Sequence, residues 1–274
     1  MSGDKHIPQR IVSLQPSATV TLRDVGVLDR LVACTKYCAD ACPEVAQHSL
    51  LIVSDSWRAQ AEQILATQPD LVLASVPYQV ESISEILKAG IRFLALAPRT
   101  LAHVYTDIGI IGGVVGQQAR SEVLLARMEQ RLNEVRCRTE ELPKQKVFCE
   151  QWGKPIMASQ PWVAELVEAA GGAFVGMPGA TLDAEDVAAA DPDVILAAWC
   201  GAGDRVPLEK IVQQRGWQEL SAVRLGRVFC IQDELLNTPA STLLGGLNAI
   251  ACALHPELFP SAQGMRQIDW QTVA

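Results

Sequence analysis

Tryptophan is the residue type whose placement first indicates a binding surface in this chain. Six Trp and three Tyr occur among its 274 residues, of which only 5% are aromatic. Wide rings placed at strand ends can line a ligand site, and the alternative for each ring is a place in the core. The rings that fall at or just after expected strand ends are Trp57, Tyr78, Trp152, Trp162 and Trp199. Trp217, at a helical position before Leu220, is expected in the core.

A run of cysteines is the second group that could do chemistry. Cys34, Cys38 and Cys42 recur at every fourth residue, with His48 close behind them. Thiolates bind soft metals, so the three residues could form a metal site. A zinc site would be expected to carry a Cys-x-x-Cys pair and a fourth ligand, and the segment has neither. Buried or incidental thiols are therefore the preferred interpretation, and a metal site is the alternative.

Motifs of common enzyme classes are absent from the sequence. It contains no Gly-x-Ser-x-Gly, no His-Glu-x-x-His and no phosphate-binding loop. The glycines between positions 109 and 116 do not follow an expected strand, which argues against a dinucleotide site. We therefore expect a protein that is not an enzyme and that requires no cofactor.

Charge and hydropathy exclude two further classes of partner. The net charge is −8 and no dense Lys/Arg cluster occurs, so nucleic acid is not expected as a partner. No apolar run has the length of a membrane span, so insertion into a membrane is not expected. The first ten residues lack the pattern of an export leader. As written, the chain is expected in the cytoplasm, and in the periplasm if a leader has been removed.

Short apolar strands alternate with helical patterns in both halves of the chain. The expected strands include Ile11–Leu14, Leu31–Cys34, Leu71–Ala74, Ile91–Leu96, Val147–Glu150, Ile156–Ala158, Val194–Ala198 and Val228–Ile231. Strands separated by helices are typical of parallel sheets covered on both faces. Between about Leu101 and Glu141 the strand signal is missing, and apolar residues recur at helical spacing.

These patterns predict an α/β protein with two Rossmann-like lobes. The expected organisation is an N-terminal lobe of residues 1–112, a long linking helix within 113–143 and a C-terminal lobe of residues 144–274. An internal echo supports it, because Ala61–Ala74 and Ala184–Ala197 both read as a helix, a Pro-Asp turn and an apolar strand. Chance is the alternative, since this connection is common. Ligands of such sheets bind beyond the carboxyl ends of the strands, so a ligand cleft between the lobes is expected.

Several segments, taken in order, resemble one family. They are Arg10–Thr19, Val25–Arg30, Gln68–Leu73, Gln151–Ile156 and Pro161–Gly172. Together they are similar to the helical-backbone (class III) substrate-binding proteins of ABC importers, and most similar to the vitamin B12-binding branch. The similarity extends from about Gln9 to Pro256. The missing leader and the cysteine-rich segment depart from the family's pattern.

The resemblance implies non-catalytic binding of a small metal chelate and docking on an ABC permease. Glu81 and Glu209 begin matching helices of the two lobes and are the docking candidates, since acidic residues of this family meet arginines of the permease. The alternative for both is a carboxylate that is favourable in a first helical turn without any partner.

A corrinoid such as cobalamin is the ligand we expect. A corrin ring is wide and largely apolar, so it needs broad aromatic walls with a few polar contacts. The alternatives are a ferric siderophore or haem in the same fold, or a cytoplasmic metal or redox sensor, or a chaperone, that reuses the fold.

Overall fold

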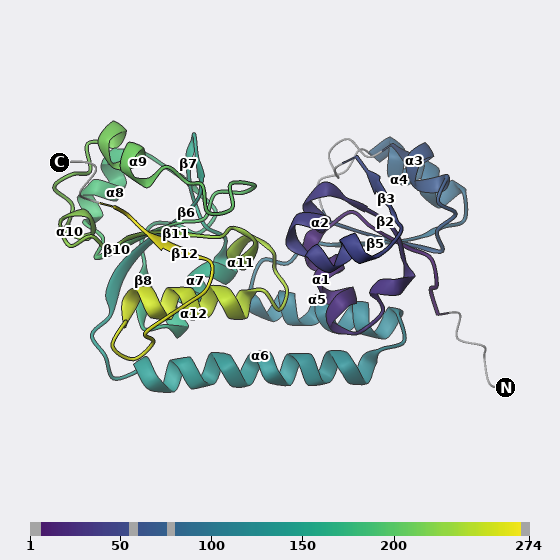
Figure 1. The fold of residues 1–274 in the computed structure, drawn as a ribbon, viewed down its shortest axis with the longest axis horizontal. Coiled ribbons are helices and arrows are strands. Elements are labelled where there is room, and N and C mark those ends of the chain that lie inside the picture. The colour runs from purple at the N-terminus through teal and green to yellow at the C-terminus, as the bar shows by residue number, and fades with distance from the viewer. Residues whose placement is uncertain (1–6, 55–59, 76–79, 270–274) are drawn as a thin grey trace. The chain divides into compact units, whose positions relative to one another are not determined.

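The computed structural model describes residues 7–54, 60–75 and 80–269. The chain divides into two compact units, Met1–Arg127 (unit 1) and Met128–Ala274 (unit 2). Each unit is built on its own β-sheet with helices on its faces, which confirms the α/β class predicted from the sequence (Figure 1). The boundary falls inside α6 (Gln118–Thr139), a helix within the stretch predicted to link the lobes.

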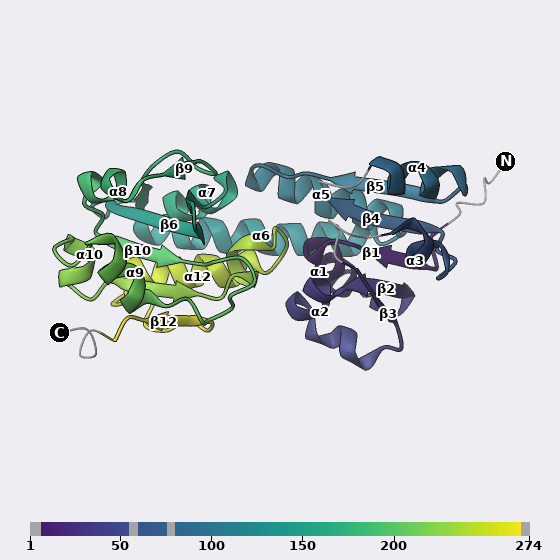
Figure 2. The same cartoon turned by 90° about the horizontal axis from the view of Figure 1, so that it is seen from above.

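Unit 1 contains a parallel sheet with the strand order β3-β2-β1-β4-β5, which Figure 2 shows from above. Every neighbouring pair in it is parallel. The strands are β1 (Ile11–Ser13), β2 (Leu31–Thr35), β3 (Leu51–Val53), β4 (Leu71–Ser75) and β5 (Arg92–Leu96). The helices are α1 (Pro16–Asp24), α2 (Lys36–Ala41), α3 (Ala61–Leu65), α4 (Val80–Lys88) and α5 (Leu101–Val114), with 3-10 turns η1 (Leu28–Arg30) and η2 (Pro43–Gln47).

Both faces of this sheet are covered, which explains why its central strands read as continuous apolar runs. Figure 1 shows α3 and α4 on one side and α1 and α5 on the other. On the first side, Val12 and Val72 pack in one buried cluster with Ile64 of α3 and Ile86 of α4. Alternate residues such as Ile11 point to the second side and are also buried.

Unit 2 contains a seven-stranded mixed sheet of order β12-β11-β10-β6-β7-β9, with β8 also paired to β6. The pairs β6–β10, β10–β11 and β6–β8 are parallel, and β6–β7, β7–β9 and β11–β12 are antiparallel. The strands are β6 (Gln145–Gly153), β7 (Ile156–Ala158), β8 (Gly172–Phe174), β9 (Thr181–Leu182), β10 (Val194–Ala197), β11 (Val228–Ile231) and β12 (Met265–Gln267). The sequence predicts parallel strands, and the antiparallel ones form a hairpin and edges around that parallel centre.

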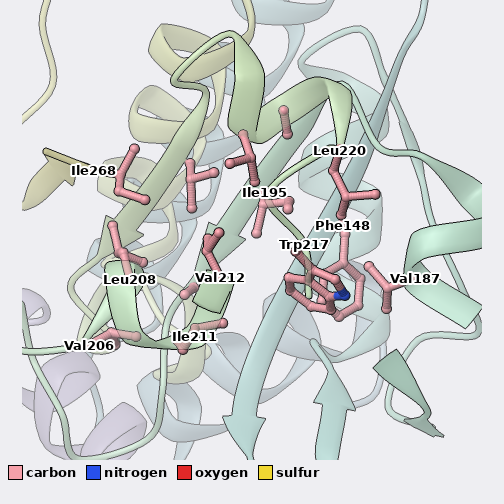
Figure 3. Packing of buried hydrophobic residues seen from close by; sticks show 14 of the residues in the cluster. Phe148, Val187, Ile195, Val206, Leu208, Ile211, Val212, Trp217, Leu220 and Ile268 are labelled. Carbon is pink, nitrogen blue, oxygen red and sulfur yellow. The ribbon is translucent and has the colours of Figure 1, made fainter. Parts of the chain in front are cut away.

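The core of unit 2 is built around Trp217, as the sequence predicts. The ring is fully buried, its Nε1 donates to the Ala184 carbonyl at 3.1 Å, and it meets Phe148 edge-on with centroids 6.1 Å apart. Figure 3 shows this pair with Val187 and Val212 around it. The helices of this unit are α7 (Pro161–Ala169), α8 (Ala184–Ala190), α9 (Leu208–Arg215), α10 (Ser221–Arg224), α11 (Glu234–Asn237) and α12 (Leu243–Leu254).

The internal echo has a structural counterpart in the α3–β4 and α8–β10 connections. The residue before each proline takes a left-handed backbone, with φ of 50° at Gln68 and 42° at Asp191. Such φ values are uncommon outside glycine. The two turns therefore share an unusual backbone conformation as well as their sequence.

The aspartate that follows each proline makes the same contact in both units. Asp70 accepts the backbone N–H of Arg10 at 3.0 Å, just before β1, and Asp193 accepts that of Lys146 at 2.7 Å, at the start of β6. Each aspartate thereby ties a helix–strand turn to the start of the central strand of its sheet. This repeated contact favours two lobes of similar construction over a chance match.

Within the described ranges, no helix combines the length and the apolar character needed to cross a membrane.

Candidate ligand-binding site

The carboxyl ends of three parallel strands form one edge of the unit 2 sheet. Glu150 of β6 pairs with Ala197 of β10, and Ala197 pairs with Cys230 of β11. Trp152 lies two residues beyond this level on β6, and Trp199 lies two residues beyond it after β10. The structure therefore brings these two predicted ligand-binding residues to the same edge, where ligands of parallel sheets bind.

Trp152 presents its ring to solvent. Its side chain is 46% exposed, and its Nε1 donates to the Lys154 carbonyl at 2.9 Å. Because the indole N–H already has an acceptor, the exposed part of the ring is apolar. Such a surface can contact a flat apolar ligand without leaving a polar group unpaired.

Trp199 is partly buried and packs against the main chain of β6. A Cβ atom at Gly153 would overlap Cζ2 of the Trp199 ring, so only glycine leaves room for the ring in this position. The main chain is held on both sides of Trp199, because Ala198 N donates to Glu150 O at 2.8 Å and Cys200 N donates to Gln151 O at 3.1 Å. The ring is therefore seated on the end of β6.

The loop after β10 is fastened by side chains that follow β11. The Asp233 carboxylate accepts the N–H groups of Gly201 and Gly203 at 2.7 and 2.8 Å. Asn237 donates to the Ala198 carbonyl at 2.7 Å. Both glycines have φ values in the left-handed region, 76° and 58°, which glycine adopts most readily. These contacts make the loop that carries Trp199 a defined part of the site.

Behind Trp199 lies a buried ion pair that the sequence reasoning missed. Glu150 has no exposed surface, and Arg215 of α9 donates to both of its carboxylate oxygens at 2.7 and 2.9 Å. Burial raises the pKa of Glu150, and Arg215 acts against this rise. The sequence contained one signal for this ion pair, which is a glutamate at the end of an expected apolar strand. A carboxylate buried there needs a positively charged partner.

Trp162 lies in the core, which is the alternative that the sequence leaves open for it. It lies in the first turn of α7 with only 8% of its surface exposed, and its Nε1 donates to the Leu236 carbonyl at 2.9 Å. The ring therefore belongs to the interior of unit 2, because this face of α7 packs against the segment that contains α11 and α12.

In unit 1, Trp57 and Tyr78 lie outside the described residues. The structure instead places another aromatic residue, Tyr37, directly after β2, with 48% of its surface exposed. The signal in the sequence was its position three residues after the expected strand Leu31–Cys34. Nearby at the start of α1, Gln15 is 7% exposed, and its Oε1 has no hydrogen-bond partner among the residues that the structure describes.

The structure does not assemble Cys34, Cys38 and Cys42 into the predicted metal site. All three are buried, and the Cys42 thiol faces Glu44 Oε2 at 3.4 Å. In the described part of the chain, no group of three or more His, Cys, Asp or Glu side chains is arranged to hold a metal ion. The segment forms the end of β2 and the short helix α2, which directs the thiols into the core.

Cys38 is nevertheless an unusual thiol. Burial raises its pKa, but hydrogen bonds with Cys34, Thr19 and Thr35 outweigh burial and lower the pKa to about 7. Hydrogen bonding with Cys38 and burial raise the pKa of Cys34. The Cys38 thiol is also held by geometry, because it accepts a hydrogen bond from Thr35 Oγ1 at 3.2 Å and donates to the Ser13 carbonyl at 3.5 Å.

The two predicted docking residues occupy first helical turns, as expected. Glu81 is exposed on α4. Glu209 on α9 has a side chain that is 29% exposed, lies 3.8 Å from Arg266 and accepts the backbone N–H of Asp269 at 3.2 Å. Glu81 thus offers its charge to solvent, whereas the charge of Glu209 is partly balanced within unit 2.

Known proteins share both the sequence pattern and the fold. An uncharacterised ABC transporter substrate-binding lipoprotein of Bacillus subtilis is 24% identical over 270 residues, which cover 93% of this chain and 82% of that protein. A vitamin B12-binding protein of Vibrio cholerae is 25% identical over 259 residues, covering 90% of this chain and 89% of that protein.

Solved structures of two kinds of binding protein have the same fold. The periplasmic vitamin B12-binding protein of Vibrio cholerae matches with a TM-score of 0.73 and 23% identity, covering 90% of this chain and 96% of that one. A periplasmic haem-binding protein of Pseudomonas aeruginosa matches with a TM-score of 0.81 and 21% identity, covering 96% of both chains.

The family model described as periplasmic binding protein matches residues 11–235, which is most of the chain. Its members serve as the substrate-binding components of ABC importers and work with a permease. The resemblance inferred from the sequence motifs is therefore confirmed, and the chain belongs to the periplasmic binding protein family as a solute-binding protein of the ABC importer type.

Proposed function

We propose that the solute is a corrinoid of the cobalamin type, bound without catalysis. The observation that carries this proposal is the pair of indoles at one edge of the unit 2 sheet. Trp152 is 46% exposed and Trp199 is partly exposed beside the end of the same strand. A corrin ring is wide and largely apolar, so broad aromatic surfaces suit it. The relatives named for cobalamin or vitamin B12 support the same ligand.

The way this edge is built also suits tight binding. Trp152 is fixed by its bond to Lys154, and the loop that carries Trp199 is tied by Asp233 and Asn237. Ordering a side chain on binding costs about 0.5–1.5 kcal/mol, so rings that are already held reduce that cost.

Haem is the second candidate, and Tyr37 is the observation that favours it. A tyrosine oxygen can ligate haem iron, and Tyr37 is 48% exposed just after β2. Haem as the solute is also supported by the solved haem-binding proteins that have this fold. No residue of the corrinoid proposal depends on Tyr37, so the two candidates can be separated by mutation.

Titration of the purified protein with cyanocobalamin, aquocobalamin and hemin tests both candidates. We expect saturable one-to-one corrinoid binding at or below about 1 μM, seen by Trp fluorescence and by calorimetry. Trp199→Ala is expected to weaken it about tenfold or more, since a buried aromatic contact is worth on the order of 1–3 kcal/mol.

Tyr37→Phe is the matched control, and it should leave corrinoid binding unchanged. Absence of binding to either corrinoid would contradict the proposal. Binding of hemin that is lost in Tyr37→Phe would establish the second candidate in its place.

Docking on the permease is the second part of the proposed function. Glu81 is exposed in the first turn of α4 and can meet a positive side chain of a partner. Glu209 already lies near Arg266, so its contribution is expected to be smaller. Both carboxylates are exposed enough for a partner to reach them.

A charge reversal on α4 tests this part. Glu81→Lys in the native cells should reduce uptake of radiolabelled cobalamin several-fold, because the reversed charge repels a positive partner. Glu85→Lys, one turn along the same exposed helix, is the control and should leave uptake near normal. Equal uptake in the two variants, with equal affinity for cyanocobalamin, would reject Glu81 as a docking residue.

A further inference from the structure

The Glu150–Arg215 ion pair is deeply buried in unit 2. Glu150 is 0% exposed and the Arg215 side chain is 11% exposed, and the guanidinium binds both carboxylate oxygens. Removing two charges from water is costly, and buried ion pairs can often be replaced by apolar residues without loss of stability. Burial of the pair therefore does not by itself indicate a stabilising role. The groups that the pair holds in place indicate another role.

The contacts of the pair lead to one side chain. Arg215 Nη2 also donates to the Gly153 carbonyl at 3.1 Å, and its guanidinium lies over the buried Trp217 ring at 4.8 Å. Gly153 is the residue against which the Trp199 ring packs. One guanidinium therefore joins the buried core of unit 2 to the strand end that supports Trp199.

Glu150 approaches the same ring from its other end. Its carbonyl accepts the Ala198 N–H at 2.8 Å, directly before Trp199. The indole N–H of Trp199 is buried without a hydrogen bond of ordinary geometry in the described part of the chain.

We propose that Glu150 and Arg215 are positioning residues that set the orientation of the Trp199 ring from behind the binding surface. Arg215 holds the main chain on which the ring rests, and the Glu150 carboxylate holds the Arg215 guanidinium in place. Neither charged group contacts the ligand. For the ligand itself, this inference rests on the proposed corrinoid function. In that setting the pair helps to select a flat ligand, because a ring held at one angle favours a partner of matching shape.

Variants that remove the pair while keeping the core test this inference. They are Glu150→Gln, Arg215→Met and the double variant Glu150→Gln/Arg215→Met. Each single variant leaves one buried charge without its partner and can fail to fold. The double variant leaves no unpaired buried charge, so the inference can still be tested with it. Val212→Ala is the matched control, because Val212 lies on the same helix α9, is 1% exposed and packs in the core without contacting the pair by any polar group.

The first readout needs no ligand. Each protein is prepared with and without the additional substitution Trp199→Phe. The difference between the two emission spectra is the emission of Trp199, and the quenching of this emission by acrylamide is measured. We expect the quenching constant to rise about twofold in the double variant and to stay unchanged in Val212→Ala. Unchanged quenching of Trp199 in the double variant would overturn the inference.

The second readout is affinity for cyanocobalamin. The double variant should bind it about tenfold more weakly, the size expected when a ring must be ordered on binding, and Val212→Ala should bind it as the wild type does. Wild-type affinity in the double variant would also overturn the inference. If the wild-type protein does not bind cyanocobalamin, the proposed ligand fails, while the quenching readout still decides the positioning role.

Discussion

Replacing Trp217 by Ala is expected to lower the free energy of unfolding of unit 2 by about 3–5 kcal/mol, the cost of removing a large ring from a packed core. Trp217 is fully buried, bonds the Ala184 carbonyl, meets Phe148 edge-on and lies under the Arg215 guanidinium. Its removal would leave a cavity between the sheet and α8 and α9. It would also remove the aromatic face on which a buried cation rests.

Urea unfolding combined with hydrogen exchange measures this effect, because exchange resolves the two units separately. Protection should fall throughout residues 128–274 and remain unchanged in residues 1–127. Leu225→Ala in the same unit is the control, since Leu225 is 69% exposed and its loss should cost less than about 0.5 kcal/mol. If Trp217→Ala lowers the free energy of unfolding by less than about 1 kcal/mol, the prediction is wrong, because neighbouring side chains then fill the cavity that the ring leaves.

Gly153→Ala is expected to displace the Trp199 ring and to cost about 1–3 kcal/mol, as overpacking does. A Cβ atom here would overlap three atoms of that ring, while the φ angle of Gly153 lies outside the left-handed region. The backbone therefore accepts alanine, and the conflict is with the ring alone. Under the proposed function, affinity for cyanocobalamin should fall together with the shift of the ring.

A double-mutant cycle isolates this conflict. In a Trp199→Ala background the added methyl group should cost far less, giving a coupling of about 1 kcal/mol or more between the two positions. Gly109→Ala in α5 is the control, because a Cβ atom there meets nothing within 4 Å and alanine favours a helix. Additive effects of Gly153→Ala and Trp199→Ala would contradict the packing described for the ring.

Both effects trace to one strand, β6. The inward side chain of Phe148 builds the core against Trp217, and the last residues of the same strand carry Trp152 and support Trp199. A change in the core can therefore reach the carboxyl end of β6, where the proposed site lies, through a few residues of extended chain. Because this connection is short, a change in the Glu150–Arg215 pair is expected to alter the position of the Trp199 ring.

Much of the secondary structure was predictable because its signal is local. Leu71–Ala74 and Val228–Ile231 were predicted as strands and lie within β4 and β11, since buried parallel strands are short apolar runs bounded by helices. Four strands are not predicted from the sequence, namely β3, β8, β9 and β12. Leu51 and Ile52 of β3 are half exposed at a sheet edge, and β9 exists only through its pairing with β7.

The candidate site was predictable in part for a related reason. Trp152 lies in the last residues of β6 and Trp199 follows β10, and the carboxyl ends of such strands are a general place for ligand contacts. Trp162 also comes after a strand, β7, yet its ring lies inside because it belongs to the first turn of α7, which faces the core. The spacing of the three cysteines allows a metal site, but buried thiols are the preferred interpretation from the sequence, and the structure places all three in the core.

The sequence by itself determined the α/β class, the two similar halves and the family, because these depend on periodicity, turn residues and motif order along the chain. Only the tertiary structure decided that Trp152 faces solvent while Trp162 is buried, that antiparallel strands border the second sheet, and that Glu150 meets Arg215 across 65 residues. The physical reason is that burial and pairing are properties of neighbours in space. The identity of a side chain and its spacing along the chain do not specify which distant residue will contact it after folding.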